Sequence, residues 1–249
     1  MRRKNAWTTY NKKQLDELEK LCKNYLKFLD KGKTERECVK QIVKQAEEKG
    51  YVNLADITKD KKALKAGDKV YSVCMDKTVA LFQIGKKKLE KGMNILGAHI
   101  DSPRMDVKQN PLYESEEFAY LDTHYYGGIK KYQWVTLPLA LHGVVVKKDG
   151  TVITVNVGED KNDPVFCVTD LLIHLAGEQM EKKANKVIEG ENLDVLVGSK
   201  PLEGKEKDAV KEGILEILKE KYDMTEEDFM SAEIEVVPAG HAREAGLDN

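Results

Sequence analysis

Residues 93–103 read Met-Asn-Ile-Leu-Gly-Ala-His-Ile-Asp-Ser-Pro, a nearly continuous apolar run that ends in a polar stop. An apolar run of this length without alternation is typical of a strand buried on both faces, in the middle of an α/β sheet. Pro103 has no backbone N–H to donate to a ladder, so it should close the strand. The stretch therefore predicts an α/β fold with a central strand over 93–100.

Two helices are expected before this strand. Asn11 is a suitable N-cap for a helix whose leucines and Tyr25 recur every three or four residues over 15–29. Thr34 and Glu37 have the spacing of a capping box, and Gly50 supplies a stop for the second helix. Two short β-rich segments follow, at 70–73 and 78–82.

The chain after Pro103 changes in character. The polar and aromatic residues 114–132 suggest a loop or short edge strands. Asp149-Gly150 between two β-branched runs predicts a hairpin. The remaining elements expected are helices around 168–183 and 206–221 and a half-exposed strand over 233–237. This order suggests one α/β domain that is interrupted by an insertion.

Composition excludes several classes of protein. The 249 residues carry 41 Lys+Arg and 43 Asp+Glu, a net charge of −2, with 41% hydrophobic residues, which excludes disordered, collagen-like and membrane-spanning chains. The near-neutral charge argues against nucleic acid as a partner. No apolar run follows the basic residues at the N-terminus, so we expect no signal peptide and a cytoplasmic location. The scattered cysteines, which contain no CxxC pair, agree with a reducing compartment: Cys22, Cys38, Cys74 and Cys167.

His99 is the sharpest candidate for chemistry, because it ends the predicted strand at the edge where α/β sheets bind ligands. One imidazole nitrogen can ligate a metal, while Asp101, two residues later on the same side of an extended chain, can accept the other N–H. The alternative is a histidine that simply hydrogen-bonds to a nearby turn. The His-x-Asp pattern leaves both interpretations open.

The other four histidines are less informative. His124 lies among aromatic and glycine residues that could line a pocket, and His142 is expected to be a hydrogen-bonded sheet residue. His174 sits in an apolar segment, either as a satisfied core residue or as an interface residue that reaches into a site. His241 has no obvious role. The sequence contains no G-x-S-x-G elbow, P-loop or dinucleotide fingerprint.

Four stretches in order resemble the M18 family of metalloaminopeptidases, the aspartyl aminopeptidase and aminopeptidase I group. Residues 97–103 resemble the family's first metal-ligand motif. The Tyr-Gly-Gly-Ile segment at 126–129 with Trp134, the Ile-His-Leu segment at 173–175, and residues 237–248 are similar to later segments of the family.

The resemblance implies cytoplasmic enzymes that remove N-terminal residues, in several members acidic ones, using two zinc ions, with cobalt or manganese as alternatives. By this likeness His99 is a metal ligand and Asp101 is the catalytic-site carboxylate that orients it. His174 would reach the active site of a neighbouring subunit and help to hold the peptide substrate. The family forms homodimers that assemble into larger shells such as dodecamers, with no nucleic acid or membrane as partner.

The implied fold is a three-layer, zinc-aminopeptidase-like α/β catalytic domain interrupted by a β-rich dimerisation domain. We expect the first part of the catalytic domain at 1–106, the inserted domain at 107–232 and the start of the return at 233–249. The family's remaining ligands lie further downstream, and Asp248 does not match the bridging aspartate, so the chain is expected to be an N-terminal portion. The alternative function is a non-catalytic fragment that serves as an assembly or regulatory module.

Overall fold

The computed structural model describes residues 3–247 and divides into two compact units. Unit 1 comprises Met1–Asp101 and His241–Asn249, and unit 2 comprises Ser102–Gly240. The expected boundaries at 106/107 and 232/233 fall inside strands β4 (Arg104–Ser115) and β9 (Ala232–Pro238), both of which belong to unit 2. Asp248 lies outside the described residues.

The helices of unit 1 begin where the sequence predicts. In α1 (Lys12–Lys31) the Asn11 side chain accepts from the backbone N–H of Gln14, and in α2 (Glu35–Glu48) Thr34 and Glu37 form the expected capping box. These reciprocal bonds satisfy N–H groups that have no partner within the helix. The shorter elements are a 3-10 turn at Ala6–Thr8, α3 (Leu54–Lys59) and a second 3-10 turn at Leu89–Lys91.

Unit 1 also contains a three-stranded sheet of β1 (Val52–Asn53), β2 (Lys69–Cys74) and β3 (Thr78–Gln83), in that order. The two expected strands are therefore confirmed as β2 and β3, which pair antiparallel. Tyr71 of β2 donates to Glu47 Oε1 of α2 at 2.7 Å. This hydrogen bond to a carboxylate, more than burial, raises the pKa of Tyr71.

The expected central strand at 93–100 is wrong. This segment is extended but belongs to no sheet, and Ile95 and Leu96 are 80% and 101% exposed. A strand buried on both faces needs a neighbour on each side, and no strand among residues 3–247 pairs with it. The mixed α/β class is nevertheless confirmed, because unit 1 combines helices with a sheet that has one parallel pair.

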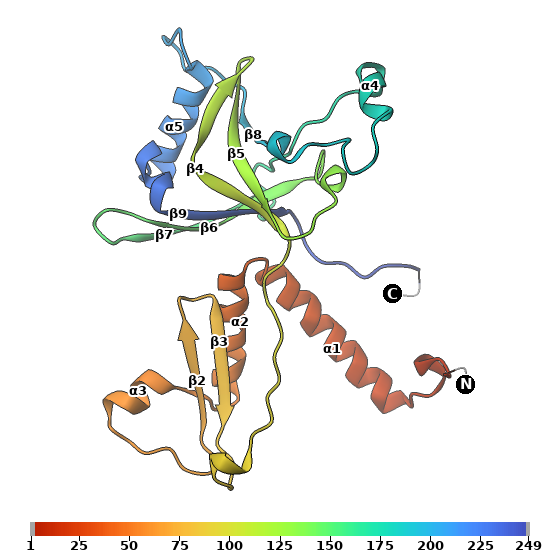
Figure 1. Cartoon of the computed structure of the whole chain (residues 1–249), viewed down its shortest axis with the longest axis vertical. Coiled ribbons are helices and arrows are strands. Elements are labelled where there is room, and N and C mark those ends of the chain that lie inside the picture. Colours follow the sequence, from red (N-terminus) through yellow and green to blue (C-terminus); the bar gives the residue numbers. More distant parts are fainter. Residues whose placement is uncertain (1–2, 248–249) are drawn as a thin grey trace. The chain divides into compact units, whose positions relative to one another are not determined.

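Unit 2 is built on a six-stranded antiparallel sheet in the order β7-β6-β9-β4-β5-β8 (Figure 1). Its hairpin of β6 and β7 closes at Gly150 as the sequence predicts. The strands are β4 (Arg104–Ser115), β5 (Phe118–Tyr126), β6 (Leu139–Val146), β7 (Val152–Val157), β8 (Val195–Gly198) and β9 (Ala232–Pro238).

Two expectations for this sheet were wrong. Residues 114–132 were expected to form a loop or edge strands, but β4 and β5 form a long hairpin in the interior of the sheet. The feature of the sequence that indicates an interior strand is the period of two in β5, where Ala119, Leu121 and Thr123 are all buried. The last strand, β9, was expected to be half exposed. It is buried over 234–237 because β6 and β4 pair with both of its edges.

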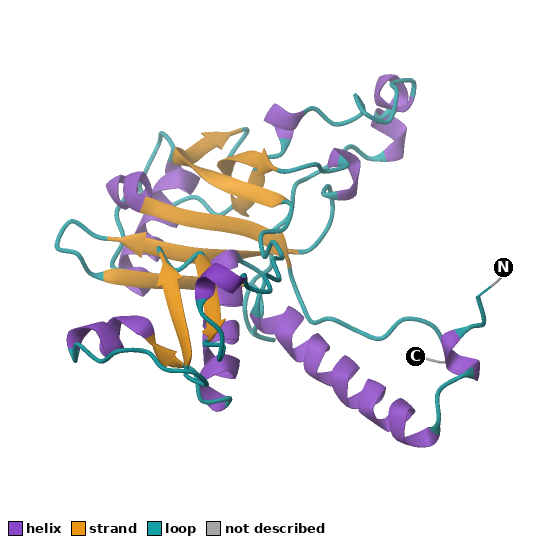
Figure 2. Ribbon diagram, turned by 60° about the horizontal axis from the view of Figure 1, so that its bottom comes forward, coloured by secondary structure: helices purple, strands orange, loops and turns teal. Residues whose placement is uncertain are grey.

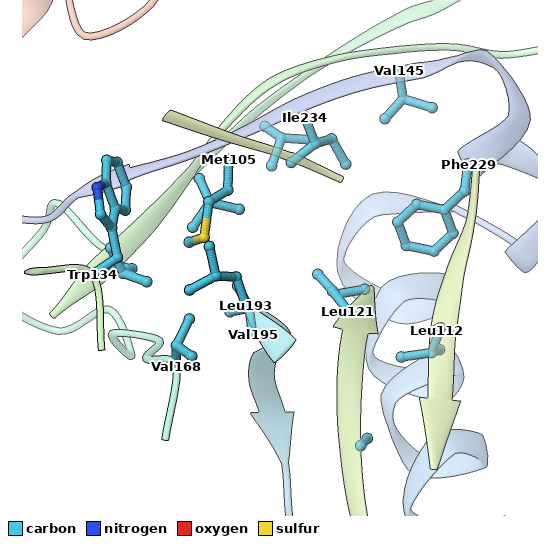
Figure 3. Close-up of a cluster of buried hydrophobic side chains, with 14 of the residues drawn as sticks. Met105, Leu112, Leu121, Trp134, Val145, Val168, Leu193, Val195, Phe229 and Ile234 are labelled. Atoms are coloured by element: carbon cyan, nitrogen blue, oxygen red, sulfur yellow. The ribbon is translucent and has the colours of Figure 1, made fainter. Parts of the chain in front are cut away.

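Helix α5 (Ala209–Tyr222) confirms the helix expected around 206–221. It packs against β4, β5 and β8. Side chains from the sheet, its connecting loops and η6 (Glu226–Ser231) form the apolar core of unit 2 (Figure 3). The core includes Met105, Leu121, Leu193, Val195, Phe229 and Ile234.

The helix expected around 168–183 is also wrong. Only a 3-10 turn at Ile173–Leu175 and the short α4 (Gly177–Met180) form there, and most of the chain between β7 and β8 is loop (Figure 2). Isolated bridges to Val135 and Leu196 hold Cys167 and Val168 in an extended conformation. Leu172 and Leu175 are both 71% exposed, so a helix here would lack the packed face that stabilises most helices in proteins.

No helix among the described residues is long and apolar enough to cross a membrane.

Candidate functional site

His99 and Asp101 lie together at the end of unit 1. His99 Nδ1 is 3.0 Å from the carbonyl oxygen of Asp101 and 3.3 Å from its Oδ1. Both neighbours are acceptors, so they favour the tautomer with a proton on Nδ1. That tautomer leaves the lone pair of Nε2 to ligate a metal, and the 84% exposed side chain of His99 is accessible to one.

This pair alone does not fit a catalytic zinc. Such a zinc is normally held by three protein ligands, and no group of three His, Cys, Asp or Glu side chains within residues 3–247 could hold a metal ion. Asp101 supports the imidazole and is not itself placed as a ligand by this geometry. The described residues therefore offer one imidazole with its orienting carboxylate, which is fewer groups than a catalytic zinc needs.

His174 belongs to unit 2 and lies in the 3-10 turn Ile173–Leu175. It is exposed, so the interpretation as a satisfied core histidine is excluded. Its neighbours are exposed apolar side chains, and exposed apolar patches of this kind mark interaction surfaces. The exposed apolar residues around it are Leu171, Leu172, Ile173 and Leu175.

A cavity of about 660 Å³ lies beside this loop within unit 2. Its walls come from the loop itself and from the chain that leads back to the sheet. Charged and amide side chains share the lining with apolar ones, as in a site for a polar ligand. The lining residues include Val135, Asp170, Leu175, Glu178, Lys182 and Asn192.

The remaining histidines have hydrogen-bonding or stacking partners in the structure. His142 is buried in β6 with Nε2 3.0 Å from Glu159 Oε1, which confirms the expected hydrogen-bonded sheet histidine. His124 stacks on the ring of Tyr125 at a centroid distance of 5.4 Å. His241 Nδ1 lies 3.3 Å from Asp30 Oδ2.

Asp30 makes a second contact with the segment that contains His241. Asp30 also accepts from the backbone N–H of Ala242 at 2.6 Å, a bond between residues 212 positions apart. It ties the end of the described chain to the end of α1. No local pattern could have predicted this contact, because its two partners lie 212 positions apart in the sequence.

Arg104 is a second feature that the sequence did not reveal. Its Nε lies 2.8 Å from Asp106 Oδ1 and 3.1 Å from Glu235 Oε2, and its guanidinium stacks on the ring of Tyr126 at 4.2 Å. The arginine is only 5% exposed, and its buried charge is compensated by one carboxylate of its own strand β4 and one of the neighbouring strand β9. In the sequence, only the alternation of β4 indicates this cluster, since it places Arg104 and Asp106 on one face of the strand.

A group of titratable side chains at the β4, β5 and β8 end of the sheet is also unusual. Tyr113 donates to Asp194 Oδ2 at 2.6 Å, and Lys108 pairs with Asp122 at 2.8 Å. Burial raises the pKa of Asp194 despite the tyrosine hydrogen bond. Burial and the same bond raise the pKa of Tyr113. These groups lie within unit 2, and His99 is not among them.

Comparison with known proteins matches residues 28–249 to the family model described as aminopeptidase I zinc metalloprotease (M18). A probable M18 family aminopeptidase 1 from Clostridium acetobutylicum is 61% identical over 246 residues, 98% of this chain and 53% of that protein. The homologous protein from Thermotoga maritima is 47% identical over 248 residues. The chain spans about half the length of the curated relatives it matches.

Solved structures agree with these matches. The crystal structure of an M18 family aminopeptidase from Thermotoga maritima superposes with a TM-score of 0.92, at 47% identity, over 100% of this chain and 53% of that one. Aminopeptidase I from Clostridium acetobutylicum gives 0.88 at 59% identity, over 100% and 55%. A dodecamer of mApe1 from S. cerevisiae gives 0.65 at 16% identity, over 93% and 51%, a likeness of fold alone.

Proposed function

The chain belongs to the M18 family of aminopeptidases, and on this premise we propose that it works as the N-terminal portion of a metal-dependent aminopeptidase. The observation that carries the proposal is the 61% identity over 98% of the chain to one half of a family member. The His99 and Asp101 geometry supports it, because the imidazole is oriented with Nε2 available.

In this proposal His99 is a ligand of one of two divalent cations, zinc in the first place with cobalt or manganese as alternatives. Asp101 orients His99 through Nδ1 and makes it more basic. The other ligands and the proton-accepting group would be supplied by a polypeptide that corresponds to the rest of the relatives. When bound, the metal would lower the pKa of a water molecule and polarise the scissile carbonyl.

Unit 2 would be the inserted assembly domain, and unit 1 the first part of the catalytic domain. The exposed apolar loop around His174 supports a role at a contact between subunits. There His174 would help to hold the peptide, and the N-terminal residues removed would include acidic ones. A homodimer that assembles into a dodecamer, as in the yeast structure, and a cytoplasmic location complete the proposal.

The test is a chimera of residues 1–249 with the remaining half of the Clostridium acetobutylicum relative. We expect hydrolysis of N-terminal residues that depends on a divalent metal. His99→Ala should abolish turnover and lower the metal content measured by mass spectrometry, whereas the matched His124→Ala should keep both. A folded chimera without turnover, or a His99→Ala variant with full metal content, would refute the proposed role.

A second function is favoured by one observation, namely the lack of a three-ligand metal group in the described residues. The chain by itself would then act as an assembly or regulatory module that joins an M18 oligomer through unit 2. Mixing the chain with the Clostridium acetobutylicum enzyme would test this alternative, since a module should co-sediment with the oligomer and change its size.

A further inference from the structure

A second cavity, of about 260 Å³, lies between the sheet of unit 2 and the C-terminal half of α5. Its walls are mostly apolar and come from the sheet, from α5 and from the loop after β7. The apolar lining includes Leu141, Val155, Val157, Phe166, Ile214 and Leu218.

This volume is large for a protein interior, which is normally packed as densely as an organic crystal. An apolar cavity of about 150 Å³ can hold benzene, which has six non-hydrogen atoms. At the roughly 25 Å³ per atom that this example implies, the cavity matches about ten non-hydrogen atoms. Ile217, which lines it, is 46% exposed, so the cavity is reached from solvent beside α5.

The cavity has two opposite charges in its lining, Asp163 and Lys221. Asp163 Oδ2 accepts from the backbone N–H of Gly158 at 3.0 Å and of Asp160 at 3.2 Å. These bonds fix the carboxylate and lower its pKa, so it is ionised at neutral pH. The charge of Lys221 adds to the lowering of the Asp163 pKa, so the two opposite charges of the lining act on each other.

We propose that this cavity binds a free α-amino acid with an apolar side chain of about the size of leucine. The whole molecule occupies the cavity: its side chain packs against the apolar walls, the ammonium pairs with Asp163 and the carboxylate pairs with Lys221. Leucine has nine non-hydrogen atoms, which agrees with the volume, and its zwitterionic end complements the two charges. A simple hydrocarbon would leave both charges unused.

The proposal concerns binding alone and does not rest on the proposed function, because every residue involved belongs to unit 2 and His99 belongs to unit 1. A binding measurement on the 249-residue chain therefore fails or succeeds independently of peptidase activity.

The first experiment is calorimetric titration of the 249-residue chain with leucine and four related compounds. Leucine should bind, 3-methylbutylamine and 4-methylpentanoate should each bind at least about fivefold more weakly because one charge contact is lost, and aspartate should not bind. Valine should lose about fourfold for its missing methylene. Equal binding of 4-methylpentanoate and leucine, or no leucine binding at concentrations on the order of 10 mM, would overturn the proposal.

The second experiment uses paired variants, with folding checked by circular dichroism. Val157→Phe fills the cavity and should abolish binding, whereas Val152→Phe on the exposed face of the same strand should not. Should Val157→Phe fail to fold, Lys221→Met carries the test: it should weaken leucine binding at least about fivefold, and Lys200→Met should leave it unchanged. Asp163→Asn keeps the acceptor for Gly158 but loses the charge, and it should weaken binding similarly.

A second copy of the chain is the competing occupant. If light scattering shows a dimer that Val157→Phe dissociates, while leucine neither binds nor competes, the cavity is a protein contact and the proposal is wrong.

Discussion

Glu114 Oε2 lies 2.8 Å from the backbone nitrogen of Val210, 96 residues further along the chain. The same oxygen accepts from the backbone N–H of Lys211 at 2.9 Å, so a carboxylate at the end of β4 caps the start of α5. It satisfies two N–H groups that the helix leaves without partners, and its negative charge is favourable at this end of the helix dipole. One side chain thus fixes α5 on the sheet beside the apolar cavity.

Removal of this cap should destabilise unit 2. Glu114→Ala is expected to lower the free energy of unfolding by about 1–2 kcal/mol, the usual cost of a lost N-terminal cap. Urea denaturation followed by circular dichroism measures it. Glu216→Ala, at an exposed position of the same helix, is the control and should change stability by less than about 0.5 kcal/mol. Equal effects of the two substitutions would mean that Glu114 contributes no more than an ordinary surface residue.

Gly143 should tolerate no side chain. A Cβ built there would lie 2.0 Å from the carbonyl oxygen of Glu233 and 2.8 Å from the Cα of Ile234, both on the paired strand β9. Gly143→Ala must therefore shift the backbone of β6 or β9, and we expect a loss of about 1–3 kcal/mol. In α4, Gly177→Ala meets nothing within 4 Å and should be neutral, as thermal unfolding of both variants would show. A neutral Gly143→Ala would disprove the close approach of these strands.

Asp223, after α5, should titrate far below an ordinary aspartate. Lys147 and Lys219 both donate to its carboxylate and lower its pKa to about 2. Because the folded-state pKa is below the unfolded value, the contribution to stability is present above about pH 4 and is lost as the pH falls through 2. A carboxyl NMR titration would measure this pKa, which Lys147→Met should raise. No change in that variant would exclude the Lys147 contact.

His174 offers a test of the assembly role in the chimeric enzyme described above. His174→Ala should lower turnover while leaving metal content unchanged, because the residue contacts substrate rather than metal in our proposal. Leu172→Ser on the same exposed loop should instead change the oligomer size, since it removes an apolar contact surface. Unchanged kinetics in His174→Ala would reject its role at the substrate.

The 249-residue chain alone should show no metal-dependent aminopeptidase activity. One histidine and its orienting carboxylate cannot hold a catalytic zinc, which needs three protein ligands. Assays with zinc, cobalt and manganese on acidic aminoacyl substrates would check this. Robust turnover would show that ligands exist which the present geometry does not reveal.

The sequence by itself determined the local elements of this protein. The caps at Asn11 and Thr34, the Asp149-Gly150 hairpin and the stripe of α5 depend on residues within a few positions of one another, so their physics can be read locally. The pairing of His99 with Asp101 is local in the same way, since two residues apart on an extended chain already face one side. The family was also evident from short ordered motifs.

Only the tertiary structure decided the rest. The apolar run 93–100 looks like a buried strand, yet it finds no partner among the described strands, because ladder formation depends on residues far away in the chain. The same reason places β9 between β6 and β4 with its edges covered, and it leaves the apolar residues around His174 exposed instead of helical. Whether a residue is buried depends on which distant segments pack against it. Its hydrophobicity shows only that burial would be favourable.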